Sequence, residues 1–125
     1  MAADWNDNQP IYRQLRDKVV GLILDDLLAE GNALPSVRNV AAEYQLNPIT
    51  VSKAYQELVD EGLVEKRRGL GMFVLEGAKS RLLEAEREQF MRAELPAFVE
   101  RVKRLGIDPR KLLDKIEQVG EREDT

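Results

Sequence analysis

The chain contains neither cysteine nor histidine, and only 6% of its residues are aromatic. Without those two residue types it can form no disulfide, no Cys or His metal site and no histidine-dependent catalytic triad. The lack of cysteine also fits a reducing compartment, so we expect a cytoplasmic protein. The sequence therefore predicts no metal and no cofactor.

Long hydrophobic runs are missing as well. The longest apolar run near the N-terminus, Val19 to Leu24, is far shorter than the roughly 20 residues that a membrane span needs. No basic stretch leads into an apolar run as it would in a signal peptide. No carboxylate pair stands out from solvated helix surface, and no Walker-type loop occurs. We therefore expect a soluble protein without a membrane partner, and not an enzyme.

The 125 residues, 43% of them hydrophobic, predict one packed domain with an appendage. The net charge of −4 argues against strong non-specific attraction to nucleic acid, but its distribution matters more than its sum. Residues 33–79 hold six basic and six acidic side chains, so this central part is neutral.

Residues 34–75 organise the chain. Ser36 is suited to cap a short helix, and a second helix begins with Asn47 as N-cap and Pro48 in its first turn. Gly62 ends that second helix. Two short helices with a tight break between them indicate a helix-turn-helix.

The start of the second helix presents polar and small apolar side chains outward. In a helix-turn-helix this part enters the major groove, where such side chains contact base edges, phosphates or a thymine methyl group. The alternative is an ordinary solvated helix face that carries one lysine. The outward residues are Ile49, Thr50, Ser52, Lys53 and Gln56.

Two strand patterns, Leu63–Lys66 and Met72–Leu75, flank the segment Arg67–Gly71. Its glycines permit a positive φ and close backbone approach, and Lys66, Arg67 and Arg68 supply cations for phosphates. This pattern predicts a wing that follows the helix-turn-helix. The alternative is a basic hairpin loop kept soluble by its charge.

The stretch from Pro10 to Val74 resembles the N-terminal domain of the GntR family of bacterial transcription regulators. The resemblance is carried by Leu34-Pro35-Ser36-x-Arg38, Ala41, Glu61-Gly62-Leu63-Val64 and Arg68-Gly69-x-Gly71-x-Phe73-Val74. The segment from Asn47 to Leu58 is similar to the recognition helix of the YtrA-like subfamily.

The resemblance implies that Arg38, the region of Gly71 and the recognition helix contact DNA. The sequence differs from many family members at Pro48, where those members carry arginine. The resemblance also implies a homodimeric repressor of a palindromic operator, with neighbouring transporter genes as expected targets, and it leaves any small-molecule effector unidentified. Together with the residue patterns it gives these DNA-binding candidates: Ser36, Arg38, Asn47, Ile49, Thr50, Ser52, Lys53, Arg67, Arg68, Gly69 and Gly71.

The remaining segments are predicted to be helical, apart from a flexible N-terminus over residues 1–9 in which Trp5 has no assigned packing site. A helix runs from Ile11 to about Ala29. Beyond a link at Gly77–Ser80, a charged helical stretch reaches about Leu105, with a kink or break before Pro96. A last helix begins at Pro109 after the cap Asp108.

The apolar stripes of residues 77–125 need a partner, and a second copy is the simplest one. The alternative is that these helices fold back on the first helix of the same subunit. The predicted fold is α+β and mostly helical, with a winged helix-turn-helix at 10–76 and a helical dimerisation region at 77–125. A second functional hypothesis is a protein-binding winged-helix adaptor. The predicted dimer interface comprises Leu83, Phe90, Phe98, Val102, Leu112, Leu113 and Ile116.

Overall fold

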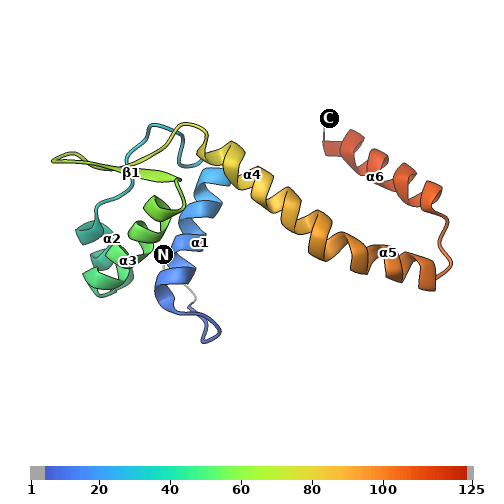
Figure 1. Ribbon diagram of the computed structural model, residues 1–125, viewed down its shortest axis with the longest axis horizontal. Coiled ribbons are helices and arrows are strands. Elements are labelled where there is room, and N and C mark those ends of the chain that lie inside the picture. The colour runs from blue at the N-terminus through green and yellow to red at the C-terminus, as the bar shows by residue number, and fades with distance from the viewer. Residues whose placement is uncertain (1–4, 124–125) are drawn as a thin grey trace. The chain divides into compact units, whose positions relative to one another are not determined.

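The computed structural model describes residues 5–123 (Figure 1). The chain divides into two compact units, Met1–Glu84 and Ala85–Thr125. The described residues are mostly helical with one small sheet, which confirms the predicted fold class. The elements are α1 (Ile11–Leu24), α2 (Val37–Tyr44), α3 (Pro48–Asp60), β1 (Val64–Arg67), β2 (Gly71–Val74), α4 (Ala78–Gln89), the π-helical turn η1 (Phe90–Glu94), α5 (Leu95–Arg104) and α6 (Pro109–Glu123).

Both predicted helix caps in the centre of the chain are confirmed. The hydroxyl of Ser36 accepts a hydrogen bond from the backbone N–H of Asn39 at 3.1 Å, and the side chain of Asn47 accepts one from Ile49 N–H at 2.9 Å. Pro48 occupies the first turn of α3, where no backbone donor is lost. Local sequence chemistry therefore fixes where α2 and α3 begin.

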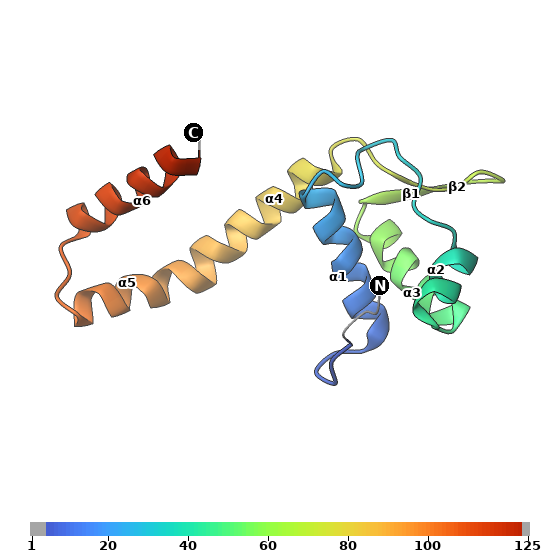
Figure 2. The same cartoon turned by 180° about the vertical axis from the view of Figure 1, so that it is seen from behind.

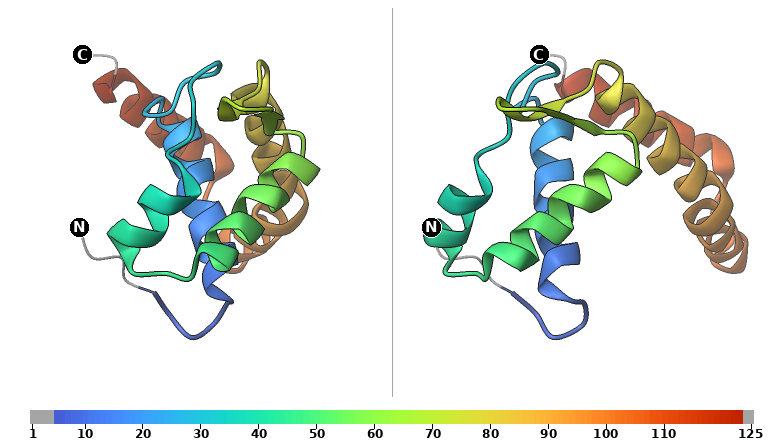
Figure 3. Two further views of the ribbon diagram at one scale, coloured as in Figure 1. Left: turned by 90° about the vertical axis from the view of Figure 1, so that its left-hand side faces the viewer. Right: turned by 60° about the vertical axis from the view of Figure 1, so that its left-hand side comes forward.

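The core of the first unit lies where α1, α2 and α3 pack together beneath the hairpin (Figure 3). Val51, Ala54 and Leu58 on the inward face of α3 have no exposed surface, and Ile23 of α1 is almost fully buried. Burial of such side chains stabilises a fold by about 1.5–3 kcal/mol each. The opposite face of α3 is consequently held outward by a rigid body.

The hairpin pairs β1 with β2 in antiparallel register, with Val64 opposite Val74 and Arg67 opposite Gly71 (Figure 2). The segment before α2 covers the free edge of β2: Gly31 N–H donates to the Val74 carbonyl at 2.8 Å, and Leu34 N–H donates to that of Met72 at 2.8 Å. These bonds fix the hairpin beside the start of α2.

The first helix is shorter than predicted, because it ends at Leu24 and not near Ala29. Asp26 adopts a left-handed φ of 61°, and the N–H groups of Leu27 and Leu28 turn back to the carbonyl of Leu22. Aspartate tolerates this conformation better than most residues. The carboxylate of Asp26 also accepts a hydrogen bond from the ammonium of Lys79 at 2.8 Å, a contact that sequence spacing does not reveal.

The segment before α1 is bound to that helix. The buried side chain of Gln14 accepts from Asn6 N–H at 3.0 Å and donates to the carbonyls of Asn6 and Gln9 at 2.8 and 2.7 Å. Trp5 packs edge-on against Tyr44, with ring centroids 5.9 Å apart. These contacts give Trp5 the packing site that the sequence left open. Residues 1–4 of the predicted flexible segment lie outside the described residues.

The helix after the wing starts at Ala78, three residues before the predicted start at Arg81. The earlier start is explained by Glu30. Its carboxylate accepts a hydrogen bond from Gly77 N–H at 2.7 Å and so satisfies a backbone donor at the start of the helix. Ala78 and Leu82 are buried in the core of the first unit.

In the second unit the predicted interruption before Pro96 takes the form of a π-helical turn. Leu95 N–H bonds to the carbonyl of Phe90, five residues back, and the backbone keeps right-handed helical angles at Glu94 and Leu95. Pro96 then lies in the first turn of α5, where its missing N–H is tolerated. Over residues 5–123, every helix is too short or too polar to traverse a bilayer.

Candidate nucleic-acid interface

The outward face of α3 carries the side chains that the sequence pattern singled out. Ile49 is 74% exposed, Ser52 and Lys53 are exposed, and Thr50 is half-buried. Gln56 belongs to the same exposed stripe, one turn beyond Ser52. This face therefore combines hydroxyl, amide, ammonium and aliphatic groups, which are the groups that contact base edges and phosphates.

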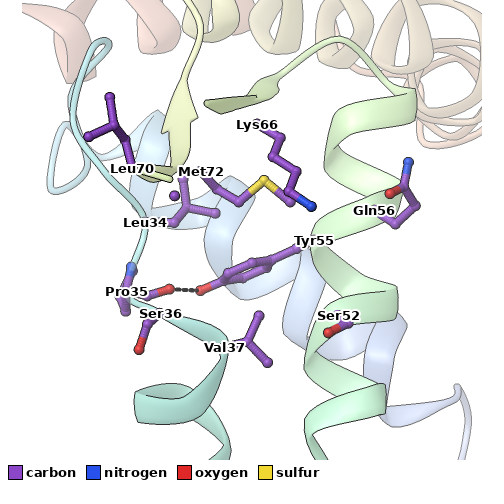
Figure 4. A pocket seen from close by; sticks show the side chains of 11 residues that line it. Leu34, Pro35, Ser36, Val37, Ser52, Tyr55, Gln56, Lys66, Leu70 and Met72 are labelled. Atoms are coloured by element: carbon purple, nitrogen blue, oxygen red, sulfur yellow. Dashed lines mark hydrogen bonds between the residues drawn. The ribbon is translucent and has the colours of Figure 1, made fainter. Parts of the chain in front are cut away.

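A groove of about 400 Å³ separates this face from the wing and from the start of α2 (Figure 4). Ser52 and Gln56 border it from α3, and Lys66 and Leu70 border it from the hairpin. The recognition helix and the wing thus flank one surface. The other lining residues are Leu34, Pro35, Ser36, Val37, Tyr55, Gly71 and Met72.

Tyr55 spans the floor of this groove and joins two of its walls. Its buried hydroxyl donates a hydrogen bond to the carbonyl of Pro35 at 2.7 Å, which ties α3 to the residue before the Ser36 cap (Figure 4). Burial, with a smaller contribution from Tyr44, raises the pKa of Tyr55 to about 12. The hydroxyl therefore remains protonated and donates at neutral pH.

The wing ends in a tight turn built on two glycines. Leu70 N–H donates to the Arg67 carbonyl at 2.9 Å, and Gly69 and Gly71 adopt φ values of 77° and 114°. A Cβ atom at either glycine would meet no atom within 4 Å, so the backbone conformation and not crowding requires glycine there. The predicted use of the glycines in a turn is confirmed.

The wing cations differ in their surroundings. Arg67 pairs with Glu65 at 2.8 Å and lies over the ring of Phe73 at 4.3 Å. Lys66 and Arg68 are exposed, and neither has a carboxylate at salt-bridge distance in the described part of the chain. Arg67 is thus partly engaged within the hairpin, whereas its two neighbours offer their full charge.

Two carboxylates near the C-terminal end of α3 pair with arginines of α1. Glu57 forms an ion pair with Arg13 of α1, and Glu61 forms one with Arg16. The hydrogen bond to Glu61 raises the pKa of Arg16, so the guanidinium of Arg16 stays charged. Asp60 accepts a hydrogen bond from Gln56 at 2.9 Å.

Several cations on the proposed DNA side lack such partners, although Arg67 pairs with Glu65. Within residues 5–123, Arg38 and Lys53 have no carboxylate at salt-bridge distance, as is true of Arg68. Glu57 and Glu61 are therefore paired with cations, whereas Arg38, Lys53 and Arg68 have no carboxylate partner in the described residues. Such a patch attracts phosphates in spite of the negative net charge.

Two of the predicted DNA-binding residues already have a structural role. Ser36 and Asn47 act as helix caps, so their side-chain oxygens already accept a backbone hydrogen bond. Gln56 and Lys66, which the sequence pattern places on the DNA side, border the groove together with Leu70, although none of the three is in the list of DNA-binding candidates. Only the folded hairpin brings Leu70 to the groove, so no sequence signal identifies it.

Residues 11–74, about half of the chain, match the family described as "Bacterial regulatory proteins, gntR family". The chain belongs to the GntR family. This membership confirms the resemblance and makes the chain a transcriptional regulator with a GntR DNA-binding domain, and not an enzyme.

Three relatives show that the similarity extends beyond this domain. The chain is 32% identical to YhcF of Bacillus subtilis strain 168, an uncharacterized HTH-type transcriptional regulator, over 97% of this chain and 98% of that protein. It is 34% identical to the HTH-type transcriptional repressor YtrA of the same strain, over 94% and 89%. A chain from Bacteroides thetaiotaomicron, assigned as a GntR-family transcriptional regulator, superposes with a TM-score of 0.73 at 30% identity, over 91% and 99%. The chain is therefore a YtrA-like member of the family.

Proposed function

We propose that this GntR-family chain is a homodimeric repressor that binds a palindromic operator. In this proposal α3 enters the major groove, where Ile49, Thr50, Ser52 and Lys53 read base edges. Residues of the wing and residues at the starts of α2 and α3 contact the phosphate backbone. The residues assigned to the backbone are Ser36, Arg38, Asn47, Arg67, Arg68, Gly69 and Gly71.

The observation that carries this proposal is the groove shared by α3 and the wing. Ser52 and Gln56 face Lys66 and Leu70 across it, so one DNA strand can contact both elements at once. Glu57 and Glu61 are paired with arginines of α1, while Arg38, Lys53 and Arg68 have no carboxylate partner within the described chain. Phosphate contacts fix register and base contacts supply sequence specificity.

The second unit supports the assignment of a dimer. Phe90, Phe98, Leu113 and Ile116 are each about half or more exposed, which is unusual for large apolar side chains gathered in about 40 residues. Phe98, Leu112, Ile116 and Val119 line an apolar cleft of about 290 Å³ between α5 and α6. A second copy would cover these side chains and would place two recognition helices on two half-sites.

The predicted interface residues are not equivalent. Val102 is only 9% exposed and packs inside its own unit, and Leu83 and Leu112 are half-buried. We therefore assign Phe90, Phe98, Leu113 and Ile116 to direct contact with the partner. Val102 supports the helices that carry them. The division into a reading domain at 10–76 and a dimerisation region at 77–125 remains part of the proposal.

The assignment as a repressor rests on sequence similarity to a protein that is named as a repressor. YtrA of Bacillus subtilis is named as a repressor and aligns with almost the whole chain. A homodimer seated on a promoter blocks transcription by occupancy, which needs no further activity of the protein. Transporter genes as targets rest on the subfamily resemblance alone.

Selection of bound sequences from a random DNA pool tests the proposal. We expect an inverted repeat whose half-site centres lie about one helical turn apart. Binding of the selected duplex, measured at two salt concentrations, should weaken steeply as salt rises. Recovery of unrelated sequences, or no retention of DNA at all, would contradict the proposal and favour the adaptor.

A further inference from the structure

Lys53 lies one helical turn before a carboxylate that would be expected to neutralise it. Lys53 and Glu57 are four residues apart on α3, the spacing at which opposite charges pair along a helix. Lys53 nevertheless has no carboxylate at salt-bridge distance in the described residues. Its ammonium lies 4.7 Å from the ring centroid of Tyr12, in the first turn of α1.

Glu57 is held by the residue next to Tyr12. Its Oε1 forms an ion pair and hydrogen bond with the guanidinium of Arg13. Its Oε2 is buried and has no hydrogen-bond donor among residues 5–123. The Glu57 carboxylate is thus directed toward α1, and it would need another cation if Arg13 were removed. Lys53 is the cation one turn away.

We propose that Tyr12 and Arg13 are positioning residues that keep Lys53 available to DNA. Arg13 pairs with the Glu57 carboxylate, which would otherwise compete with DNA for Lys53. The ring face of Tyr12 restrains the ammonium of the long, flexible Lys53 side chain. Restraint before binding lowers the ordering cost when the phosphate or base is met. This inference rests on the proposed contact between Lys53 and DNA, and it assigns the first turn of α1 a role in recognition without contact to DNA.

The test measures the affinity of full-length variants for the duplex selected from the random pool. Arg13→Gln should weaken binding about fivefold, because Glu57 is released and pairs with Lys53. It should also reduce the slope of log affinity against log salt by about 0.9, the loss of one phosphate neutralisation. Glu57→Gln alone should leave binding unchanged. The double variant R13Q/E57Q should recover wild-type affinity, because no carboxylate remains to neutralise Lys53.

Arg16→Gln is the matched control. It breaks the second ion pair of α1, but its partner Glu61, the residue after α3, lies eight residues from Lys53, about two turns away. Arg16 also pairs with Asp17 and is less exposed than Arg13, so thermal unfolding should show at least as much destabilisation for R16Q as for R13Q, while only R13Q weakens DNA binding. Equal loss of DNA affinity in both variants would overturn the inference, since the effect would then follow stability.

Tyr12 provides a second and independent test. Tyr12→Phe keeps an aromatic face and should bind as the wild type does, whereas Tyr12→Leu keeps bulk without that face and should weaken binding about twofold to threefold. In the background of Lys53→Ala, Y12L should have no further effect. An equal loss with or without Lys53 would overturn the assignment of Tyr12.

Lys53→Ala separates the two proposals. If K53A binds as tightly as the wild type, the proposed DNA contact of Lys53 is wrong, and this inference is wrong with it. If K53A weakens binding but R13Q/E57Q stays as weak as R13Q, Arg13 itself contacts DNA. That result would overturn the inference and leave the proposed function intact.

Discussion

The two units of the chain treat their apolar side chains in opposite ways. In the first unit they close around Val51, Tyr55 and Leu58, which are almost completely buried. In the second unit Phe98 and Ile116 remain more than half exposed, and Val102 is the large apolar side chain that is buried among the described residues of this unit. The first unit therefore buries its own core, whereas the second unit by itself leaves a large part of its apolar surface uncovered.

This difference also separates two kinds of exposed apolar residue. Ile49, on the outward face of α3, and Leu70, at the groove, are 74% and 72% exposed, and neither lines the apolar cleft of the second unit. Such single side chains suit contact with a thymine methyl group or a sugar. The apolar residues of α5 and α6 form a continuous cleft and suit a protein partner.

The largest effect should come from the core of the first unit. Leu58→Ala removes a side chain with no exposed surface and should lower the free energy of unfolding by about 3 kcal/mol. Ile116→Ala, measured in protein dilute enough to be monomeric, should change it by less than about 0.5 kcal/mol. Urea unfolding of both variants checks this contrast, and equal destabilisation would show that the two units are built alike.

The next effect concerns the second unit. Ile116→Asp places a charge in the proposed interface and should weaken self-association by at least about a hundredfold, or about 2.7 kcal/mol. Sedimentation velocity should show a monomer, with the helical circular dichroism of the first unit preserved. Glu117→Lys, on a neighbouring charged position, serves as the control and should remain dimeric. A dimeric I116D would remove the proposed interface.

The wing gives a smaller effect. Arg68→Ala should weaken binding to the selected duplex about tenfold and weaken binding to unrelated DNA in the same proportion, because a phosphate contact carries no sequence information. The salt slope should fall by about 0.9. Arg67→Ala should lose less, since Arg67 already pairs with Glu65 and Phe73. A change of preferred sequence in R68A would assign Arg68 to base reading.

The smallest effect comes from the floor of the groove. Tyr55→Phe loses the hydrogen bond to the Pro35 carbonyl and should destabilise the first unit by about 1 kcal/mol. The pKa of Tyr55 is raised from 10.0 to about 12, so unfolding exposes a more acidic phenol. The wild type should therefore lose stability as the pH rises from about 10 to 12, and the Phe variant should lose less. Parallel pH dependence of the two proteins would contradict this origin.

The features that the sequence predicted correctly are local ones. The Ser36 and Asn47 caps, the first-turn Pro48 and the positive φ at Gly69 follow from the chemistry of a few adjacent residues. The inward stripe of α3 follows from helical periodicity. These elements place Ile49, Ser52 and Lys53 outward before any tertiary contact is considered.

The features that were missed depend on residues far apart in the chain. α1 ends early because Asp26 turns the chain and contacts Lys79, and Glu30 starts α4 from across the loop. The pairing of Arg13 with Glu57 spans 44 positions. No pattern of spacing within one helix encodes such pairs, so the electrostatics of the interface emerged only from the fold.

Stoichiometry on DNA tests the central claim most directly. The account holds that the groove of the first unit binds DNA. Dimerisation through the second unit then brings the groove of a second protomer to the same duplex. Native mass spectrometry of the full chain with the selected duplex should therefore show two protomers per duplex. I116D should leave one protomer bound weakly to a half-site. A single wild-type protomer bound to the full operator, with affinity unchanged by I116D, would contradict the account.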